Sequence, residues 1–169
     1  SQSSVGLSQK EPLETLNTNI LGTQNLLEAV RRTVPECRVL LLSSSDVYGP
    51  GEGQLDTIRI ESDPFRPISP YASSKACMEI IGLQYQRAFG LHITIVRSFN
   101  FSGPCHSRRF VLPAVAEQLV YIKNYGYEPV LYTGNLDISR DFTDVRDLAR
   151  AFVLLMNTAP SGSIYNACS

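Results

Sequence analysis

The sequence predicts an α/β protein built on a parallel sheet with helices packed against its faces. Two continuous apolar runs, "CRVLLLSSS" from Cys37 and "LHITIVRSFN" from Leu91, are each typical of a strand buried on both faces. Helical patterns alternate with the strand candidates along the chain, which predicts right-handed crossovers between parallel strands. Both runs end in polar residues, so their carboxyl ends form the edge of the sheet where ligands bind in such folds.

Apolar spacing and boundary residues predict the helices. Residues 13–32 carry Leu, Ile and Val at helical spacing, after a proline suited to a first turn. A second helix begins at Tyr71 and ends at Gly90, a natural C-cap. Two further helices are expected over residues 110–124, where Pro113 either sits in the first turn or bends the helix, and over 144–157.

The connecting segments complete a single domain over residues 1–169, without internal repeat or linker. A long loop rich in Gly, Pro and Asp is expected between Gly49 and Pro70. Residues 129–135 and 139–145 fit short strands or extended loop, and 163–169 fit a last strand.

Composition argues against several classes of function. Fifteen basic and sixteen acidic residues give a net charge of -1, so we expect neither nucleic-acid nor membrane binding, and an anionic ligand must be held locally. The four cysteines show no metal-ligand spacing and are expected to be buried free thiols, with no metal bound. Free thiols, with neither a membrane span nor a signal peptide in the sequence, lead us to expect a cytoplasmic protein.

The stretch "SPYASSK" places Tyr71 and Lys75 four residues apart at the start of a helix, on one face. Spacing alone does not separate an active site from an ordinary turn of helix. The strand end "LLSSSDVYG" adds the hydroxyls of Ser43, Ser44 and Ser45 at the same edge of the sheet. A serine, a tyrosine and a lysine that converge there could polarise a carbonyl group and donate a proton to it.

These motifs, together with "NTNILGTQNLLEA", "RSFNFSGP", "GNLDISRDFTDVRD" and "YNACS", resemble the extended short-chain dehydrogenase/reductase family of nucleotide-sugar epimerases, dehydratases and reductases. The resemblance covers nearly the whole chain. It implies the second half of a doubly wound, Rossmann-like sheet with flanking helices and part of the substrate-binding region. It also implies an internal fragment without the family's N-terminal glycine-rich turn, and therefore weak binding of NADP(H) or NAD(H) and doubtful activity for these 169 residues alone.

By resemblance, Ser44, Tyr71 and Lys75 are the catalytic group. The likeness is greatest to GDP-sugar enzymes, which implies reduction of the 4-keto group of GDP-4-keto-6-deoxy-D-mannose, with Tyr71 as the proton donor. Lys75 is expected to lower the pKa of Tyr71 and, with Tyr71, Ser43 and Ser98, to contact the cofactor. Asp46 is a further catalytic candidate by resemblance, because it stands where the related dehydratase has a glutamate. A dehydratase or epimerase therefore stays open as an alternative, as does an inactive binding module.

The resemblance also implies how the sugar nucleotide is held. Asn100 and Arg140 occupy substrate-binding positions of the family, and the Arg140 guanidinium offers a bidentate fork to a phosphate group. Arg109 and Ser45 are further candidates, although solvated surface is an equally good reading of Arg109. Family members dimerise through the helices that correspond to residues 13–31 and to the helix from Tyr71, so a homodimer is expected.

Overall fold

The structure is a computed structural model that describes residues 1–50 and 58–169. In chain order the elements are α1 (Val5–Lys10), α2 (Pro12–Leu16), the π-helical turn η1 (Asn17–Leu21), α3 (Gly22–Thr33), β1 (Arg38–Ser44), the 3₁₀ turn η2 (Ser45–Tyr48), α4 (Pro70–Phe89), β2 (His92–Ser98), β3 (Asn100–Ser102), α5 (Val111–Tyr125), β4 (Phe142–Asp144), α6 (Val145–Thr158) and β5 (Ile164–Ala167).

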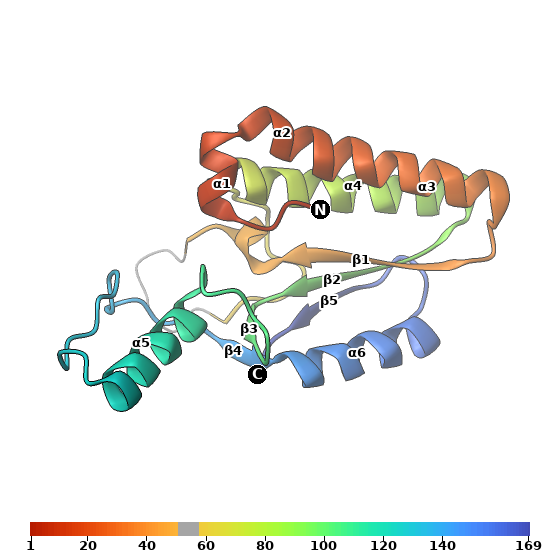
Figure 1. Ribbon diagram of the computed structural model, residues 1–169. Coiled ribbons are helices and arrows are strands. Elements are labelled where there is room, and N and C mark those ends of the chain that lie inside the picture. Colours follow the sequence, from red (N-terminus) through yellow and green to blue (C-terminus); the bar gives the residue numbers. More distant parts are fainter. Residues whose placement is uncertain (51–57) are drawn as a thin grey trace.

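The described strands form two parallel sheets. The larger has the order β1-β2-β5, and the smaller pairs β3 with β4. Helices α1 to α4 cover one face of the larger sheet and α6 covers the other (Figure 1). The predicted α/β class with parallel strands and flanking helices is confirmed. In the register of β1 and β2, Ser44 lies opposite Ser98, so both hydroxyls reach the carboxyl edge together.

One segment differs from the sequence predictions. The polar opening, for which no element was expected, contains α1, which begins where the Ser4 hydroxyl accepts a hydrogen bond from the Leu7 N–H at 3.2 Å. Both outcomes allowed for the next two segments occur: residues 129–135 form loop without a strand, and 139–145 include the short strand β4. The expected loop is confirmed over the described residues 58–69, and its residues 51–57 lie outside the described part.

The helix predicted over 13–32 is interrupted by the π-helical turn η1. A π turn contains an extra residue and therefore rotates the face that a helix presents to its neighbour. Leu13, expected on the buried face, is 75 % exposed, and the small or polar side chains of Thr15 and Asn19 are buried instead. After the turn, Leu27 and Val30 are buried as predicted.

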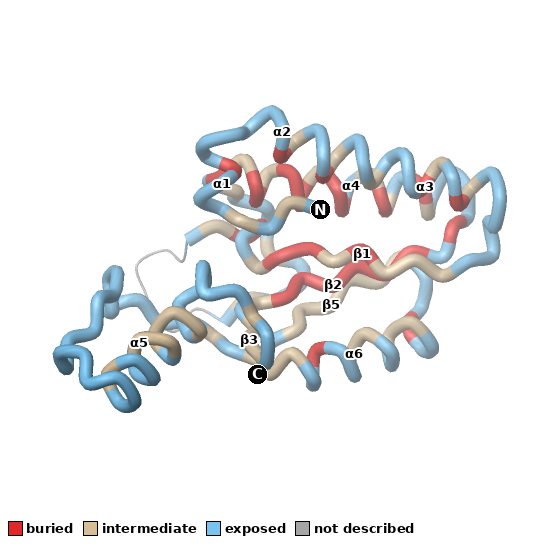
Figure 2. The backbone as a smooth tube through the Cα atoms, in the orientation of Figure 1, coloured by how far each residue is buried: buried red, intermediate tan, exposed pale blue. Residues whose placement is uncertain are grey.

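The main hydrophobic core lies between β1, β2 and the helices α3 and α4, where the buried positions concentrate in Figure 2. Its buried members are Leu27, Val30, Leu41, Met78, Tyr85, Leu91, Ile93 and Ile95. Burial of this apolar surface is the main force that holds α4 on the sheet. The core therefore fixes the direction in which the first turn of α4 points.

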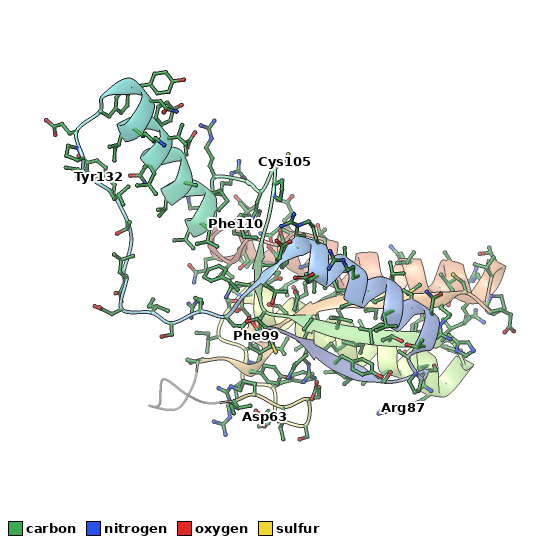
Figure 3. All side chains as sticks on the ribbon, turned by 90° about the horizontal axis from the view of Figure 1, so that it is seen from below. Asp63, Arg87, Phe99, Cys105, Phe110 and Tyr132 are labelled. Carbon is green, nitrogen blue, oxygen red and sulfur yellow. The ribbon has the colours of Figure 1, made fainter. Side chains whose placement is uncertain are left out.

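Helix α5 and the segment after it extend away from this core. None of the α5 residues is buried, and residues 126–140 are all exposed (Figure 2). In Figure 3, Tyr132 lies at the opposite end of the molecule from Arg87. Pro113 sits in the first turn of α5, one of its two expected placements.

The cysteines correct a further expectation. All four are free, but Cys37, Cys105 and Cys168 are exposed and Cys77 is half-buried. Burial fails because the three exposed residues lie in connections outside the strands and helices rather than within them. In the part of the chain that the structure describes, no helix is both long and apolar enough to cross a membrane.

Candidate active site

The first turn of α4 places Tyr71 and Lys75 at the carboxyl edge of the sheet. The helix begins at this point because the Ser69 hydroxyl accepts a hydrogen bond from the Ala72 N–H at 3.1 Å and because Pro70 suits the first helical position. Tyr71 and Lys75 are 9 % and 3 % exposed. The Lys75 Nζ lies 5.8 Å from the centre of the Tyr71 ring.

Ser44 joins this pair from the end of β1. Its hydroxyl accepts a hydrogen bond from the Asp46 N–H at 3.2 Å, which starts the η2 turn. The same side chain lies close enough to the Tyr71 hydroxyl to lower the pKa of Tyr71. Lys75 in turn donates to the carbonyl oxygen of Leu42 at 2.5 Å. The three residues predicted to be catalytic are thus brought together.

Burial controls the titration of this group. It raises the pKa of Tyr71, an effect that the Ser44 hydrogen bond partly offsets and the charge of Asp46 reinforces. It lowers the pKa of Lys75 to about 8, against the opposing charge of Glu79. The expectation that Lys75 lowers the pKa of Tyr71 is therefore wrong for this structure, because removing the phenolate from water costs more than the nearby groups return.

Asp46 and Arg140 face the same edge from two directions. Asp46 is exposed, but the surrounding protein still excludes enough water to raise the pKa of its carboxyl group. The charge of Arg140 opposes this effect and lowers the pKa of Asp46. Pairing of β3 with β4 sets Asn100 opposite Phe142, two residues after Arg140. Asn100 and Arg140 are both exposed, so the groups predicted to hold substrate are open to a ligand.

The other predicted residues differ in their access to the edge. Ser98 is buried beside Ser44, and its hydroxyl donates to the Ser43 carbonyl at 3.4 Å. Ser43 points into the interior, where its hydroxyl donates to Glu79, so that hydroxyl is not free for a cofactor. Ser45 is half-buried at the start of η2. Arg109 is exposed before α5, where its backbone N–H bonds the Ser107 hydroxyl at 3.4 Å.

A buried ionic network behind the site was missed by sequence reasoning. Glu79 on α4 and Arg97 on β2 form an ion pair at 2.8 Å, with exposed side-chain fractions of 0 % and 3 %. Arg97 also donates to the Tyr48 hydroxyl at 2.8 Å, and Tyr48 donates to Asn166 at 2.6 Å. Two signals could have revealed it: an arginine inside the apolar run "ITIVRS", and a glutamate one helical turn after Lys75.

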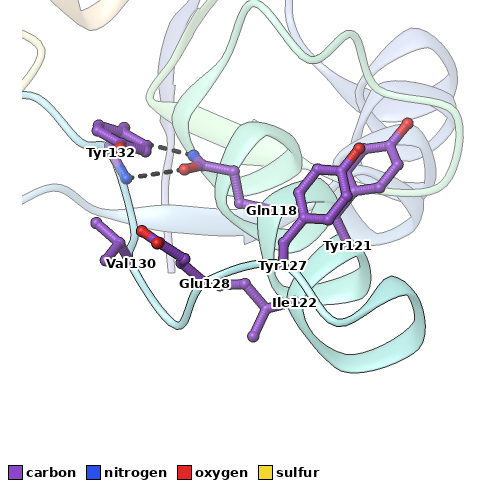
Figure 4. A pocket seen from close by; sticks show the side chains of 7 residues that line it. All are labelled: Gln118, Tyr121, Ile122, Tyr127, Glu128, Val130 and Tyr132. Carbon is purple, nitrogen blue, oxygen red and sulfur yellow. Dashed lines mark hydrogen bonds between the residues drawn. The ribbon is translucent and has the colours of Figure 1, made fainter.

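A hollow of about 380 Å³ lies at the far end of α5 (Figure 4). Tyr121 stacks on Tyr127 at its wall, and Gln118 makes two hydrogen bonds with the backbone of Tyr132, at 2.8 and 3.0 Å. It shares no residue with the predicted site. Among the described residues, no group of three His, Cys, Asp or Glu side chains could hold a metal ion.

A parallel α/β fold with a serine, a tyrosine and a lysine at the carboxyl edge of its strands defines the class of the Rossmann-like short-chain dehydrogenases/reductases. Comparison with known proteins specifies the family. The family model described as GDP-mannose 4,6 dehydratase matches residues 1–168. The chain therefore belongs to the GDP-mannose 4,6-dehydratase family.

Two curated relatives show the range of activities near this chain. It is 36% identical over 160 residues to the GDP-6-deoxy-D-mannose reductase of Pseudomonas aeruginosa, covering 95% of this chain and 52% of the relative. It is 32% identical over 156 residues to a GDP-mannose 4,6-dehydratase of Sinorhizobium fredii, covering 91% of this chain and 43% of the relative. The chain thus spans about half the length of the curated relatives it matches.

Solved structures confirm the fold. RMD from Pseudomonas aeruginosa, complexed with NADPH, matches with a TM-score of 0.94 and 35% identity, over 100% of this chain and 57% of that one. DesIV, a dTDP-glucose 4,6-dehydratase from Streptomyces venezuelae with NAD and TYD bound, matches with a TM-score of 0.85 and 30% identity, over 98% and 49%.

Proposed function

We propose that these residues form the catalytic half of an NAD(P)-dependent oxidoreductase that reduces the 4-keto group of GDP-4-keto-6-deoxy-D-mannose. The observation that carries the proposal is the convergence of Ser44, Tyr71 and Lys75 at the carboxyl ends of β1 and β2. Ser44 lies close enough to Tyr71 to lower its pKa, and the Lys75 Nζ is held beside the Tyr71 ring by the Leu42 carbonyl. A relative named as a reductase and a structural neighbour solved with NADPH support it.

Tyr71 is the proton donor in this proposal. Because burial raises its pKa above the usual value near 10, the phenol is fully protonated at neutral pH and able to give a proton to the oxygen of a carbonyl under reduction. Ser44 donates a hydrogen bond to the same oxygen, which stabilises the charge that develops there. A bound nicotinamide supplies the hydride.

Lys75 suits the cofactor role that the family resemblance implies. An ammonium group has three N–H donors, and one of them bonds the Leu42 carbonyl, which leaves two for the hydroxyls of a ribose. Ser98 lies at the same edge and is the second candidate for cofactor contact. The Ser43 hydroxyl does not fit this role, because Glu79 already accepts its hydrogen bond.

Exposed cations and amides beyond the strand ends would hold the sugar nucleotide. Arg140 supplies the fork for the diphosphate, and Asn100, carried on the paired strand β3, lies close enough in register to contact the same ligand. Ser45 and Arg109 are candidates for further contacts. Residues 1–169 act as one part of a domain in this proposal, with the remaining ligand contacts made elsewhere in the protein.

One observation favours a second candidate function, a GDP-mannose 4,6-dehydratase. The carboxylate of Asp46 acts electrostatically on Tyr71, and its own pKa is raised, as befits a group that exchanges protons with a sugar. A dehydratase returns its hydride to the product, whereas a reductase consumes NADPH in proportion to product. Measuring NADPH consumed against sugar converted separates the two.

To test catalysis, Tyr71 is replaced with Phe in the full-length natural protein that contains these residues. Turnover should fall at least about a hundredfold, because the proton donor is lost. Tyr85→Phe is the matched control, since Tyr85 is buried on the same helix and its hydroxyl bonds Glu28 away from the site. Full turnover by Tyr71→Phe would contradict the role of Tyr71 as proton donor. A nucleotide-sugar binding module would instead bind the ligand and show no turnover even in the unaltered protein.

We further propose that the protein is a cytoplasmic homodimer. Leu13, Leu26 and Ile80 are 75 %, 52 % and 56 % exposed on the helical layer formed by α2, α3 and α4, which leaves apolar surface for a second copy. Leu26→Glu should shift sedimentation toward the monomer, whereas Leu154→Glu on α6, across the sheet, should leave it unchanged. An unchanged sedimentation profile for Leu26→Glu contradicts this interface.

A further inference from the structure

Glu79 is a fully buried carboxylate to which the mechanism above gives no role. It lies one helical turn after Lys75, on the same face of α4. Its oxygens accept hydrogen bonds from the Ser43 hydroxyl and from Arg97, whose Nε and Nη2 lie 3.0 and 2.8 Å from Oε1 and Oε2. Burial of an ionised carboxylate is costly. We therefore expect the charge of Glu79, or its bonds to Ser43 and Arg97, to have a function.

Arg97 holds the carboxylate from the opposite side. Arg97 is 2 % exposed, and its guanidinium carbon Cζ lies 4.9 Å from the centre of the Tyr48 ring and 5.0 Å from that of Phe65. It also donates to the Glu61 carbonyl at 2.9 Å. Arg97 has little freedom to move, because its N–H groups donate to fixed partners on η2 and on the loop before α4. The Glu79 carboxylate paired with Arg97 is held equally firmly.

These bonds align α4 with the strand that carries Ser44. Three side chains at successive turns of α4 meet three consecutive residues at the end of β1. Lys75 bonds Leu42, Glu79 bonds Ser43, and Tyr71 lies close enough to Ser44 for that residue to lower its pKa. Ser43 and Arg97 lie opposite each other in the register of β1 and β2, directly before the pair Ser44 and Ser98. Glu79 thus joins both strands immediately behind the site.

From this geometry we propose that Glu79, held by Arg97, is a positioning residue that keeps Lys75 charged at the edge of the reaction site. The inference rests on the proposed function only for the role of Lys75. Its physical basis is that a buried ammonium needs a nearby anion to remain charged. Glu79 supplies that anion without being placed to touch substrate or cofactor.

The charged groups around Lys75 are consistent with this role. Helix α4 itself carries Tyr71 and Glu79, and the neighbouring elements carry Asp46 and Tyr48 (η2) and Arg97 (β2). Strand β1 presents only neutral groups, namely the Ser43 and Ser44 hydroxyls and the Leu42 carbonyl. Helices α2, η1 and α3 face α4 with Thr15, Asn19 and Leu27, and carry the ionic cluster of Glu28, Arg31 and Arg32 beside Tyr85. Of these groups, Glu79 raises the pKa of Lys75, which burial otherwise lowers to about 8.

The chain has only three lysines, Lys10, Lys75 and Lys123, so NMR of protein labelled with ¹³C at lysine Cε can follow Lys75 directly. The variant Lys75→Arg lacks the Lys75 signal and thereby assigns it. In Glu79→Gln, the titration midpoint of Lys75 should fall by at least about one pH unit, since an opposite charge nearby shifts a pKa by about 1 to 3 units. Glu79→Asp, which retains the anion, should restore most of the shift.

A double variant covers the case in which Glu79→Gln leaves Arg97 unpaired and fails to fold. Glu79→Gln with Arg97→Gln removes both buried charges, so it should fold, and its Lys75 midpoint should still lie below that of the unaltered protein. Glu28→Gln is the matched control, because it removes a carboxylate that contacts α4 at Tyr85, and it should leave the midpoint unchanged.

Two results would overturn the inference. One is an unchanged Lys75 midpoint in the folded variants that lack the Glu79 charge. The other is failure of the double variant to fold, which would make the pair a requirement of the core rather than a support for Lys75. The measurement needs neither substrate nor cofactor, so it is independent of the Tyr71→Phe test. If Tyr71→Phe retained full turnover, the proposed reaction would fail while the Lys75 result still stood.

Discussion

Lys75 is proposed to act in the site, yet its burial removes the ammonium group from water. A lysine that is 3 % exposed loses most of its hydration, and its pKa falls to about 8 from the usual value near 10.5. Folding therefore disfavours the charged form, because the unfolded chain binds the proton more tightly than the folded chain does. Between these two pKa values, stability must rise with pH.

This linkage gives a prediction for Lys75→Met. From pH 7 to about 9.5, the free energy of unfolding of the unaltered protein should rise relative to the variant by on the order of 2 kcal/mol, as the folded lysine loses its proton first. Denaturant titrations of both proteins across this range measure the difference. A difference that stays constant with pH would show that Lys75 titrates normally.

Residue types alone could indicate which groups meet, but not which way each one points. The spacing of Tyr71 and Lys75 and the polar end of β1 were sufficient to predict a cluster at the edge of the sheet. Ser43 and Ser44 are identical in type and adjacent in sequence, yet the hydroxyl of Ser43 bonds Glu79 in the interior and that of Ser44 acts on Tyr71. Successive residues of a strand point to opposite faces, and only the packing of α4 shows which face becomes the site.

At the scale of elements, the close approach of α4 to β1 positions the site. Gly82 is buried at this contact, and a Cβ atom at that position would lie 2.4 Å from Cδ1 of Leu41. Leu41 is itself buried in the core, so it has little room to move aside. The absence of a side chain at residue 82 therefore sets how closely the helix lies on the strand.

Gly82→Ala should destabilise the fold by about 1 to 3 kcal/mol, because overpacking outweighs the better helix propensity of alanine. Gly22→Ala is the matched control: a Cβ atom there meets nothing within 4 Å, and the change should be neutral or stabilising by up to about 1 kcal/mol. Thermal or denaturant unfolding compares the two. Gly82→Ala as stable as Gly22→Ala would contradict this account of the contact.

The π-helical turn shows where element prediction from sequence ends. Helical spacing correctly indicated a helix over 13–32, but not the extra residue in η1 that turns Leu13 outward and Asn19 inward. Asn19 is satisfied there by Ser74 on α4, whose hydroxyl lies 2.8 Å from the amide. That bond spans 55 residues of sequence, so no local pattern could have predicted it.

Across the whole molecule, packing is uneven. The core joins β1 and β2 to α3 and α4, whereas α5 buries none of its residues and the segment from 126 to 140 is exposed throughout. Local stability follows the amount of buried apolar surface. The two ends of the molecule should therefore open with different free energies.

Hydrogen exchange should reveal this difference. Amides of β1, β2 and α4 should exchange slowest, at rates close to those of global unfolding, and those of residues 126–140 should exchange fastest. Mass spectrometry of peptic fragments after timed deuteration measures both regions in one sample. Equal protection of the two regions would mean that the α5 segment folds as part of the core.

The sequence by itself determined the fold class, the order of most elements and the three residues proposed for catalysis, because these depend on periodicity and on short motifs within one strand end and one helix start. The tertiary structure decided which of the adjacent serines faces the site, how burial shifts the pKa values of Tyr71 and Lys75, and that Glu79 and Arg97 meet behind them. These properties depend on contacts between residues far apart in the chain, and on the water that those contacts exclude.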